Sequence, residues 1–293
     1  MPGDCTEVSA YCPVSATTLG YYPNKPLNIF IAVAFGLAAL ITLVVGIWKR
    51  TWAYMGFIVA GTVLELAGYG GRIALSANPW NQQAFETQIC AIILAPTLIC
   101  ISIYLTLKHL CLAFSPAGAL TPRVRPALLP FLFVPADVSC LLVQAIGGAL
   151  AASAGHSAAT LNEPLLRAGN HAIIAGIALQ VVVLLVFGAL SADYWLRARR
   201  LVKTAGADAG AVAMWHDKRV RMFVGAMVGA YCCVQIRCVY RVAEMAGGWG
   251  NPIMQDQPSF TVLDSFMMLI TVWLLACFPP GVFFPAMVSD PEP

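Results

Sequence analysis

The sequence predicts an all-α protein, an integral membrane bundle of seven transmembrane helices with its N-terminus outside and its C-terminus in the cytoplasm. Of the 293 residues, 59% are apolar and 11% are charged, about half the ~25% charged fraction of an ordinary soluble domain. Four windows, residues 26–48, 87–107, 168–192 and 265–289, contain no Asp, Glu, Lys or Arg. Each window is long enough to cross a hydrocarbon core of roughly 30 Å as a helix. The distribution of Lys and Arg between the apolar stretches predicts the orientation.

Apolar stretches separated by helix-breaking residues define the seven spans. In chain order they cover Leu27 to Ile47, Trp52 to Leu75, Gln88 to Leu110, Ala127 to Ala152, Gly169 to Trp195, Arg221 to Met245 and Phe260 to Phe284. Connections such as "SANPWNQQ", "FSPAGALTPRVRP" and "GGWGNPIMQDQP" contain the Gly, Pro, Ser and Asn that mark loops. We therefore expect a short extracellular tail at 1–26, a seven-helix domain at 27–286 and a short cytoplasmic tail at 287–293.

Basic residues are concentrated in alternate loops. The first loop has Lys49 and Arg50, and the third has Arg123 and Arg125. The fifth has six basic residues: Arg197, Arg199, Arg200, Lys203, Lys218 and Arg219. The second and sixth loops have none, and the fourth has only Arg167. The positive-inside rule thus places loops one, three and five in the cytoplasm, and the net charge of +3 gives no indication of a nucleic-acid partner.

Two of the ten cysteines lie in the predicted outside tail. Cys5 and Cys12 are there in a compartment that permits a disulfide, and we expect them to form one, although spacing alone does not fix connectivity. The other eight lie in or at the ends of spans without CxxC spacing. These eight are expected to be small apolar packing residues.

Charged side chains inside the spans are the main functional signal. Seven of the ionisable residues that fall there carry this signal: Glu65, Arg72, Asp137, Arg237, Arg241, Glu244 and Asp264. Each unpaired charge would cost roughly 2.5–3.5 kcal/mol at a helix centre, so these groups must pair or face water. The alternative interpretation is purely structural: these charges only stabilise the helices, with Arg241 paired to Glu244 and Glu65 paired to Arg72.

Helical spacing groups the same residues onto faces. Glu65 and Arg72 are seven residues apart and share one face of span two, and Arg237 and Arg241 are one turn apart in span six. Span four repeats the seven-residue spacing with Asp137 and Gln144, and span five has an amide, Gln180, near its middle. This is more polarity than helix packing requires, since small residues pack helices at lower cost. We therefore expect one polar cavity that narrows from the outer leaflet towards the membrane centre.

Pro96 lies inside the third span. A proline within a helix either kinks it or leaves a carbonyl without its donor. Both alternatives stay open at the level of the sequence.

The sequence lacks the motifs that are typical of several classes of protein. The chain has no GxxxxGK[ST], GxSxG or HExxH, and its four histidines are scattered near span ends, which argues against a nucleotide hydrolase, a serine hydrolase and an intramembrane zinc or haem site. No lysine is placed in mid-membrane to hold retinal. We expect no cofactor, no metal and no enzymatic activity, which leaves a carrier, a lipid flippase or a seven-helix receptor.

Five segments together resemble the fungal lipid-translocating exporter family, the RTA-like seven-helix proteins named after resistance to aminocholesterol. The segments are "GTVLELAGYGGR", "ILAPTLICISIY", "DVSCLLVQAIGG", "GIALQVVVLLVF" and "IRCVYRVAEMAGG". Their order and spacing carry the resemblance, which extends over nearly the whole chain from "YYPN" onward. It implies export of sphingoid bases, tolerance of toxic amphiphiles or porphyrin uptake, in a plasma membrane, vacuolar membrane or other endomembrane.

The charges and the resemblance together predict a substrate site. The candidate substrate-binding residues are Glu65, Arg72, Asp137, Gln144, Gln180, Arg237, Tyr240, Arg241, Glu244 and Asp264. The expected partners are membrane lipids and an amphipathic small-molecule substrate, translocated through a polar groove without ATP hydrolysis by this chain. The alternative is a receptor or sensor that binds a lipid-like or porphyrin-like ligand without transporting it. The sequence leaves the oligomeric state open.

Two positions depart from the pattern of the family it resembles. Gln257 stands where a Glu usually precedes Asp264 by seven residues, and Pro279 stands where the last span usually ends in His-Pro-Gly. These departures leave the identity of the substrate open.

Overall fold

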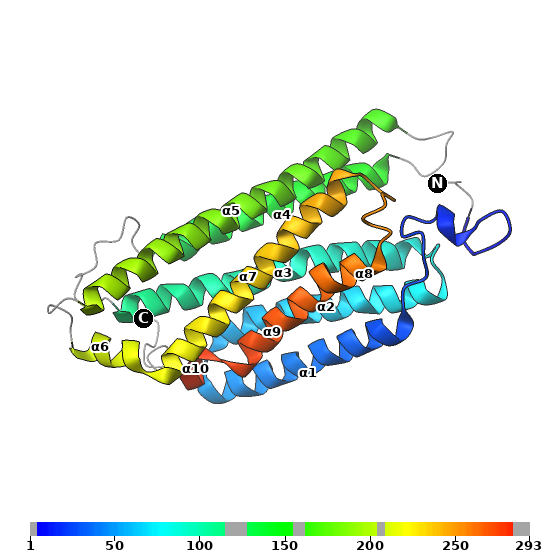
Figure 1. The fold of residues 1–293 in the computed structure, drawn as a ribbon. Helices are drawn as coiled ribbons and strands as arrows, with labels where there is room; N and C mark the ends of the chain where they lie inside the picture. Colours follow the sequence, from blue (N-terminus) through cyan, green and yellow to red (C-terminus); the bar gives the residue numbers. More distant parts are fainter. Residues whose placement is uncertain (1–4, 115–127, 155–161, 204–208, 284–293) are drawn as a thin grey trace.

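A computed structural model describes residues 5–114, 128–154, 162–203 and 209–283 (Figure 1). Within these ranges the secondary structure is helical. The helices are α1 (Lys25–Lys49), α2 (Trp52–Ala77), α3 (Gln82–Phe114), α4 (Leu129–Ser153), α5 (Glu163–Lys203), α6 (Ala209–His216), α7 (Lys218–Ala246), α8 (Gln257–Phe260), α9 (Met267–Cys277) and α10 (Pro280–Phe283), with a 3-10 turn η1 (Val14–Ala16) and a π-helical segment η3 (Thr261–Phe266).

The seven predicted spans are confirmed. Seven helical stretches are long and apolar enough to cross a membrane, and the last of them, Gln257–Phe283, is assembled from α8, η3, α9 and α10. Two details differ from the prediction: the fifth helix is much longer than the expected span, and the short helix α6 was not expected at all. The expected cytoplasmic tail lies outside the described residues.

Local sequence signals explain where α1 and α7 begin. The side chain of Asn24 accepts a hydrogen bond from the backbone nitrogen of Leu27, and a proline occupies the first turn of α1. Asp217 caps α7 in the same way by accepting from the backbone nitrogen of Arg219. Both residues satisfy donors that a helix start leaves without an intrahelical partner. Arg50 ends α1 in the left-handed conformation, with φ 56°.

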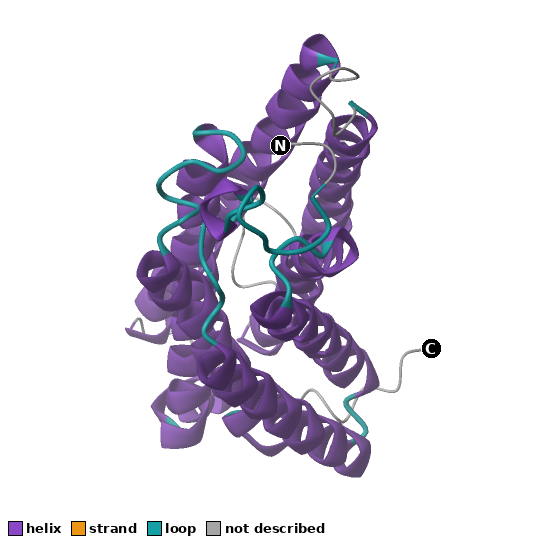
Figure 2. Ribbon diagram, turned by 90° about the vertical axis from the view of Figure 1, so that its right-hand side faces the viewer, coloured by secondary structure: helices purple, strands orange, loops and turns teal. Residues whose placement is uncertain are grey.

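Glycines bring neighbouring helices into close contact. A Cβ atom on Gly147 of α4 would lie 2.7 Å from the carbonyl oxygen of Gly169 in α5, and one on Gly61 of α2 would lie 2.9 Å from that of Ala95 in α3. Only glycine tolerates such approaches, and small residues at helix contacts are typical of membrane bundles. Figure 1 shows the resulting pairs, α4 beside α5 and α2 beside α3, with α7 running obliquely across the bundle, and Figure 2 shows the same helical bundle turned by 90°.

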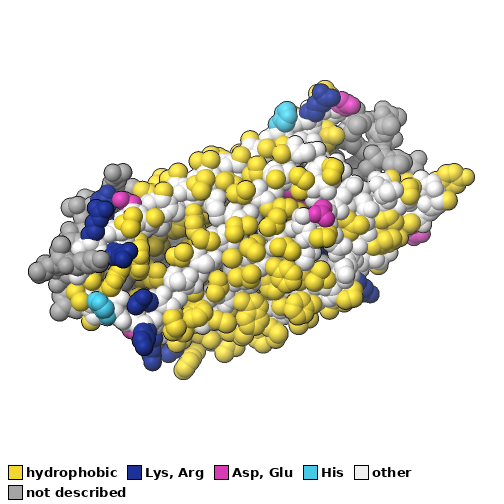
Figure 3. Space-filling view, in the orientation of Figure 1, with side chains coloured by type: hydrophobic (Ala, Val, Ile, Leu, Met, Phe, Trp, Pro, Cys, Tyr) yellow, Lys and Arg dark blue, Asp and Glu magenta, His cyan; other side chains and the backbone are white. Residues whose placement is uncertain are grey.

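The outside of the bundle is apolar along its middle. Large exposed side chains include Phe30, Val33, Leu37, Leu40 and Val44 on α1 and Phe131, Leu142 and Ile146 on α4. Figure 3 shows hydrophobic side chains over the central surface and charged ones towards the two ends. Such a surface matches lipid contact.

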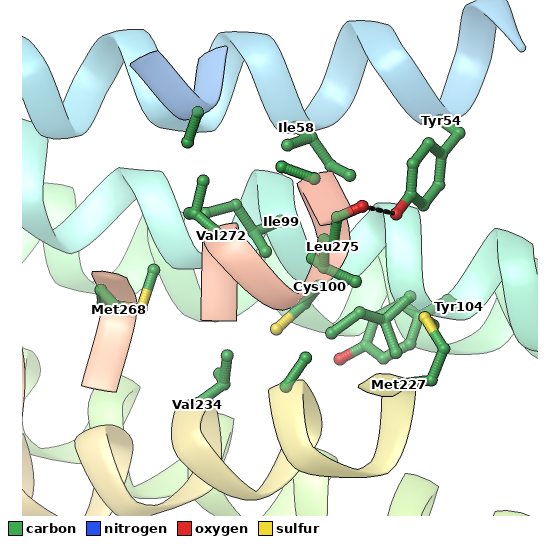
Figure 4. Close-up of a cluster of buried hydrophobic side chains, with 14 of the residues drawn as sticks. Tyr54, Ile58, Ile99, Cys100, Tyr104, Met227, Val234, Met268, Val272 and Leu275 are labelled. Atoms are coloured by element: carbon green, nitrogen blue, oxygen red, sulfur yellow. Dashed lines mark hydrogen bonds between the residues drawn. The ribbon is translucent and has the colours of Figure 1, made fainter. Parts of the chain in front are cut away.

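The interior is packed around α2, α3, α7 and α9. Ile58, Ile99, Val234 and Val272 are buried there, and the hydroxyl of Tyr54 donates to the carbonyl oxygen of Leu275 at 2.9 Å (Figure 4). The N-terminal segment lies at one end of this bundle and α10 lies at the other (Figure 1). An odd number of spans produces this arrangement.

Candidate functional site

The centre of the site is a carboxylate shared by two arginines. Asp264 Oδ1 lies 3.0 Å from Arg237 Nε and 2.8 Å from Arg241 Nε, and Arg241 Nη1 lies 2.6 Å from Glu244 Oε2. All four side chains are at least mostly buried, and we call them the charge network. Two positive and two negative charges balance, which lowers the cost of holding them inside the membrane.

The backbone explains how one oxygen reaches both arginines. Arg237 and Arg241 are one helical turn apart on α7, so their guanidiniums emerge on the same face. Asp264 lies in the π-helical segment η3, where the helix is wider than an α-helix. Segments of this kind occur frequently at functional sites.

Arg237 is held from a third side by α3. Its Nη2 donates to the carbonyl oxygen of Ile92 at 2.6 Å. In a regular helix this oxygen would accept from the backbone nitrogen of residue 96, but Pro96 has no N–H to donate. The structure thus shows a use for the carbonyl that Pro96 frees.

Arg72 joins the site through an aromatic ring. Its guanidinium carbon lies 4.0 Å from the centroid of the Phe260 ring, and that of Arg241 lies 5.3 Å from the same centroid. Arg72 Nη2 also donates to the hydroxyl of Tyr21 at 2.7 Å. Phe260 thus connects α2 to the charge network through cation–π attraction.

Glu65 is a buried carboxylate beside this network. It has no exposed surface, and neither of its oxygens has a hydrogen-bond partner among the described residues. Its charge interacts with those of Arg237, Arg241 and Asp264. The pairing of Glu65 with Arg72, which belonged to the purely structural alternative, is not formed, because Arg72 points instead to Tyr21 and Phe260.

A small cavity lies over the charged groups. Its volume is about 20 Å³, and its lining includes Leu19, Arg72, Gln88, Arg241 and Glu244. A single water needs roughly 10–15 Å³, so the cavity accommodates water but no lipid headgroup. In this structure the cavity is therefore too small to hold a substrate headgroup.

The N-terminal segment covers this cavity. Leu19 lines it directly, and Tyr21 reaches Arg72. A disulfide between Cys5 and Cys12 closes the preceding loop. Two side chains of the α2–α3 connection anchor that loop: Trp80 donates to the carbonyl of Cys12 at 3.2 Å and Asn78 donates to that of Thr6 at 2.9 Å.

Asp137, Gln144 and Gln180 form a second polar set between α3, α4 and α5. The hydroxyl of Tyr104 donates to Asp137 Oδ2 at 2.6 Å. Gln144 Nε2 donates to Gln180 Oε1 at 3.3 Å, and Gln180 Nε2 donates to Thr97 Oγ1 at 3.1 Å. None of the three lines the cavity over the charge network. Among the described residues, the polar side chains thus fall into two sets and not into one continuous cavity.

Tyr240 lies at the edge of the first set. It is buried in a small apolar cluster with Ile92 and Phe260, and its hydroxyl has no hydrogen-bond partner among the described residues. Its position on α7 keeps it within the candidate site.

Sequence reasoning missed several residues of the site. Phe260, Gln88, Thr97 and Tyr21 were not among the candidate site residues. Tyr104 belongs to one of the motifs, but its partner was not foreseen. The proline four residues after Ile92 was the one signal in the sequence that pointed to a new hydrogen-bond acceptor. No group of three or more His, Cys, Asp or Glu side chains in the described ranges is placed to hold a metal ion.

A bundle of seven membrane-spanning helices with a balanced, buried charge network defines an integral membrane protein with a polar intramembrane site. This arrangement is typical of transporters and receptors. The family model described as RTA1 like protein matches residues 58–287, and the chain belongs to this fungal family.

Curated relatives are transporters by name. The sphingoid long-chain base transporter RSB1 of Saccharomyces cerevisiae is 28% identical over 292 residues, which cover 90% of this chain and 74% of the relative. The probable lipid transporter atnI of Emericella nidulans is 23% identical over 284 residues, covering 96% and 69%. Protoporphyrin uptake protein 1 of Saccharomyces cerevisiae is 24% identical over 240 residues, covering 81% and 71%. These names indicate a transporter and not an enzyme, and no solved structure matches the chain.

Proposed function

We propose that the protein translocates amphipathic lipids with a cationic headgroup, such as a sphingoid base, across its membrane. The names of the relatives support a role in lipid transport. We propose that the headgroup passes the charge network, Glu65 and Arg72 while the hydrocarbon portion remains in lipid. The proposed membrane is the plasma membrane, with the N-terminal segment outside.

The preference for a cationic headgroup rests on one observation: several buried carboxylate oxygens have no hydrogen-bond donor among the described residues. Both oxygens of Glu65, Oδ1 of Asp137 and Oδ2 of Asp264 are buried without a hydrogen-bond partner among the described residues. A buried acceptor without a donor is costly. An ammonium group with neighbouring hydroxyls supplies the donors that these oxygens require, whereas a phosphate would supply further acceptors.

The small cavity indicates that translocation needs a wider state. At about 20 Å³ it is far below the roughly 300–1,000 Å³ of ligand sites. We propose that the N-terminal segment around Leu19 and Tyr21 moves to admit the headgroup, since this segment covers the cavity and is joined to Arg72 through a single hydrogen bond. The sequence contains no phosphate-binding loop of the GxxxxGK[ST] type, and we propose that this chain does not itself drive the movement by ATP hydrolysis.

The test is leaflet exchange in liposomes. Purified protein is reconstituted, a fluorescent sphingoid base is placed in one leaflet, and the exchange rate is followed by adding a membrane-impermeant quencher. We expect faster exchange than in empty liposomes. A variant with both Arg241→Gln and Glu244→Gln is expected to lose this gain, because it removes one positive and one negative charge together and leaves the pair of Arg237 and Asp264 balanced.

The chain offers a matched control. Arg167 and Glu163 form an ion pair of 2.9 Å that is exposed at the start of α5. Replacing both with Gln also removes one charge of each sign, but it should leave exchange unchanged, because exposed pairs contribute little. Wild-type exchange no faster than in empty liposomes would refute the proposal, and saturable binding without exchange would identify a sensor instead.

A further inference from the structure

A second pocket lies at the opposite end of the bundle from the N-terminal segment. It has a volume of about 360 Å³ and is lined by Trp195, Arg199, Trp215, His216 and Arg221. These residues come from the end of α5, from α6 and from the start of α7. Arg221 and Arg237 are sixteen residues apart, so the pocket lies roughly 24 Å along α7 from the charge network. It is therefore distinct from the proposed translocation site, and its volume falls within the range of small-molecule sites.

Two stacked indoles form one wall of this pocket. The rings of Trp195 and Trp215 are 4.4 Å apart at their centroids, with an angle of 29° between their planes. Both rings pack in part against the interior cluster of the bundle. The wall is thus anchored to the fold, and the short helix α6 acquires a clear role in presenting Trp215.

Two arginines line this pocket and would attract a negatively charged ligand. Arg199 and Arg221 come from different helices and line the same pocket, and neither forms an ion pair with an acidic side chain among the described residues. The acidic side chains closest in sequence are engaged elsewhere. Asp193 pairs with Arg197 at 3.0 Å, and Asp217 caps α7. The pocket is consequently positive, and guanidinium groups suit phosphate.

The surroundings of the pocket indicate a lipid as the source of the phosphate. Leu196 and Met222, which adjoin the lining residues in sequence, are 52% and 49% exposed. Trp195 and Arg199 lie at the end of the fifth span, where tryptophan and basic side chains meet the membrane–water interface. Figure 3 shows Lys and Arg side chains gathered at this end of the bundle, next to hydrophobic ones. A free phosphate ion would leave the indole wall and most of the volume unused.

We propose that this pocket binds the phosphate-bearing headgroup of an anionic phospholipid. Arg199 and Arg221 contact the phosphate, and the indole wall packs against the rest of the headgroup. Under the proposed orientation the pocket faces the cytoplasmic leaflet, which is rich in anionic lipid. The proposal does not depend on what the charge network transports.

The test is direct lipid binding by native mass spectrometry. The detergent-purified full chain is titrated with phosphatidylinositol 4-phosphate at physiological ionic strength, with phosphatidylcholine as the neutral reference. We expect one tightly bound anionic lipid per chain. Replacing both Arg199 and Arg221 with Gln should weaken its binding by roughly tenfold or more, because two charge-assisted contacts are lost.

The matched control removes the same charge from the same end of the bundle. Lys218→Gln combined with Arg219→Gln leaves the pocket lining intact and should weaken binding by less than about threefold, because neither side chain lines the pocket and charges at a distance are screened. An equal loss in both double variants would overturn the proposal and indicate a diffuse basic surface. Displacement of the lipid by equimolar inorganic phosphate would also overturn it, since the source would then be the free ion.

Both arginines are exposed, so the variants should remain folded, and their melting temperatures check this. If the double variant does not fold, Arg221→Gln alone provides the same comparison. In that case, unchanged lipid binding would count against the pocket.

Discussion

Arg237 Nη2 donates to the carbonyl oxygen of Ile92 at 2.6 Å, and this oxygen is free because Pro96 lacks the backbone N–H that would otherwise bind it. The carbonyl oxygen that α3 leaves without its usual donor thus serves as a fixed acceptor for an arginine of α7. A neutral carbonyl positions the guanidinium without adding a negative charge, so the balance of the charge network is preserved.

This relationship predicts energetic coupling between Pro96 and Arg237. Pro96→Ala restores a donor that competes for the Ile92 carbonyl, and it should weaken the bond from Arg237. A double-mutant cycle with Pro96→Ala and Arg237→Lys should show a coupling free energy of unfolding of about 1 kcal/mol. Urea unfolding in detergent micelles measures it. Strictly additive changes would show that the carbonyl does not position Arg237.

Neutralising Asp264 alone should destabilise the fold. Asp264→Asn leaves the guanidiniums of Arg237 and Arg241 without their shared carboxylate, and we expect it to destabilise the fold by about 3–5 kcal/mol. The double variant Asp264→Asn with Arg237→Gln removes one charge of each sign and should recover part of this loss. Thermal unfolding of the two variants side by side provides the measurement. A double variant as unstable as the single one would argue against charge balance as the cause.

The spans were predictable from the sequence because each depends on local composition. Charge-free windows and loop residues located the helices, and four-residue spacing correctly placed Arg237 and Arg241 on one face. The pairing across helices was less predictable. Glu65 and Arg72 share a face of α2, yet Arg72 reaches Tyr21 and Phe260, which are far away in the sequence.

The widened backbone of η3 is another feature that residue spacing does not reveal. A π-helical segment changes which side chains share a face, so the contact between Asp264 and both arginines does not follow from a count of 3.6 residues per turn. The separation of the polar side chains into two sets was likewise not predicted, since the sequence predicts one cavity. Whether Asp137 meets Tyr104 or the charge network depends on how α4 packs, and span composition contains no such information.

Phe260 provides a test of the cation–π contacts. Phe260→Leu keeps an apolar side chain but removes the ring that both Arg72 and Arg241 approach, and it should destabilise the fold by roughly 0.5–2 kcal/mol beyond the effect of lost packing. Phe260→Tyr keeps the ring face and serves as the control for this contact. Melting temperatures of the two variants make the comparison. Equal stability of the Leu and Tyr variants would show that Phe260 stabilises the fold through packing alone.

The disulfide should control how firmly the N-terminal segment covers the cavity. Replacing both Cys5 and Cys12 with Ser removes a short loop closure that contributes about 2–3 kcal/mol in the chain-entropy model. The anchoring bonds of Trp80 and Asn78 would then hold a less restricted loop. We expect faster amide hydrogen exchange in residues 14–21 and unchanged exchange in α9, because the bridge touches only the tail. Tyr21→Phe, which removes the bond to Arg72 but keeps the ring, should loosen the same segment with the disulfide intact. If exchange in this segment were unchanged in both variants, the cover would be held by packing of residues such as Leu19 and not by these two links.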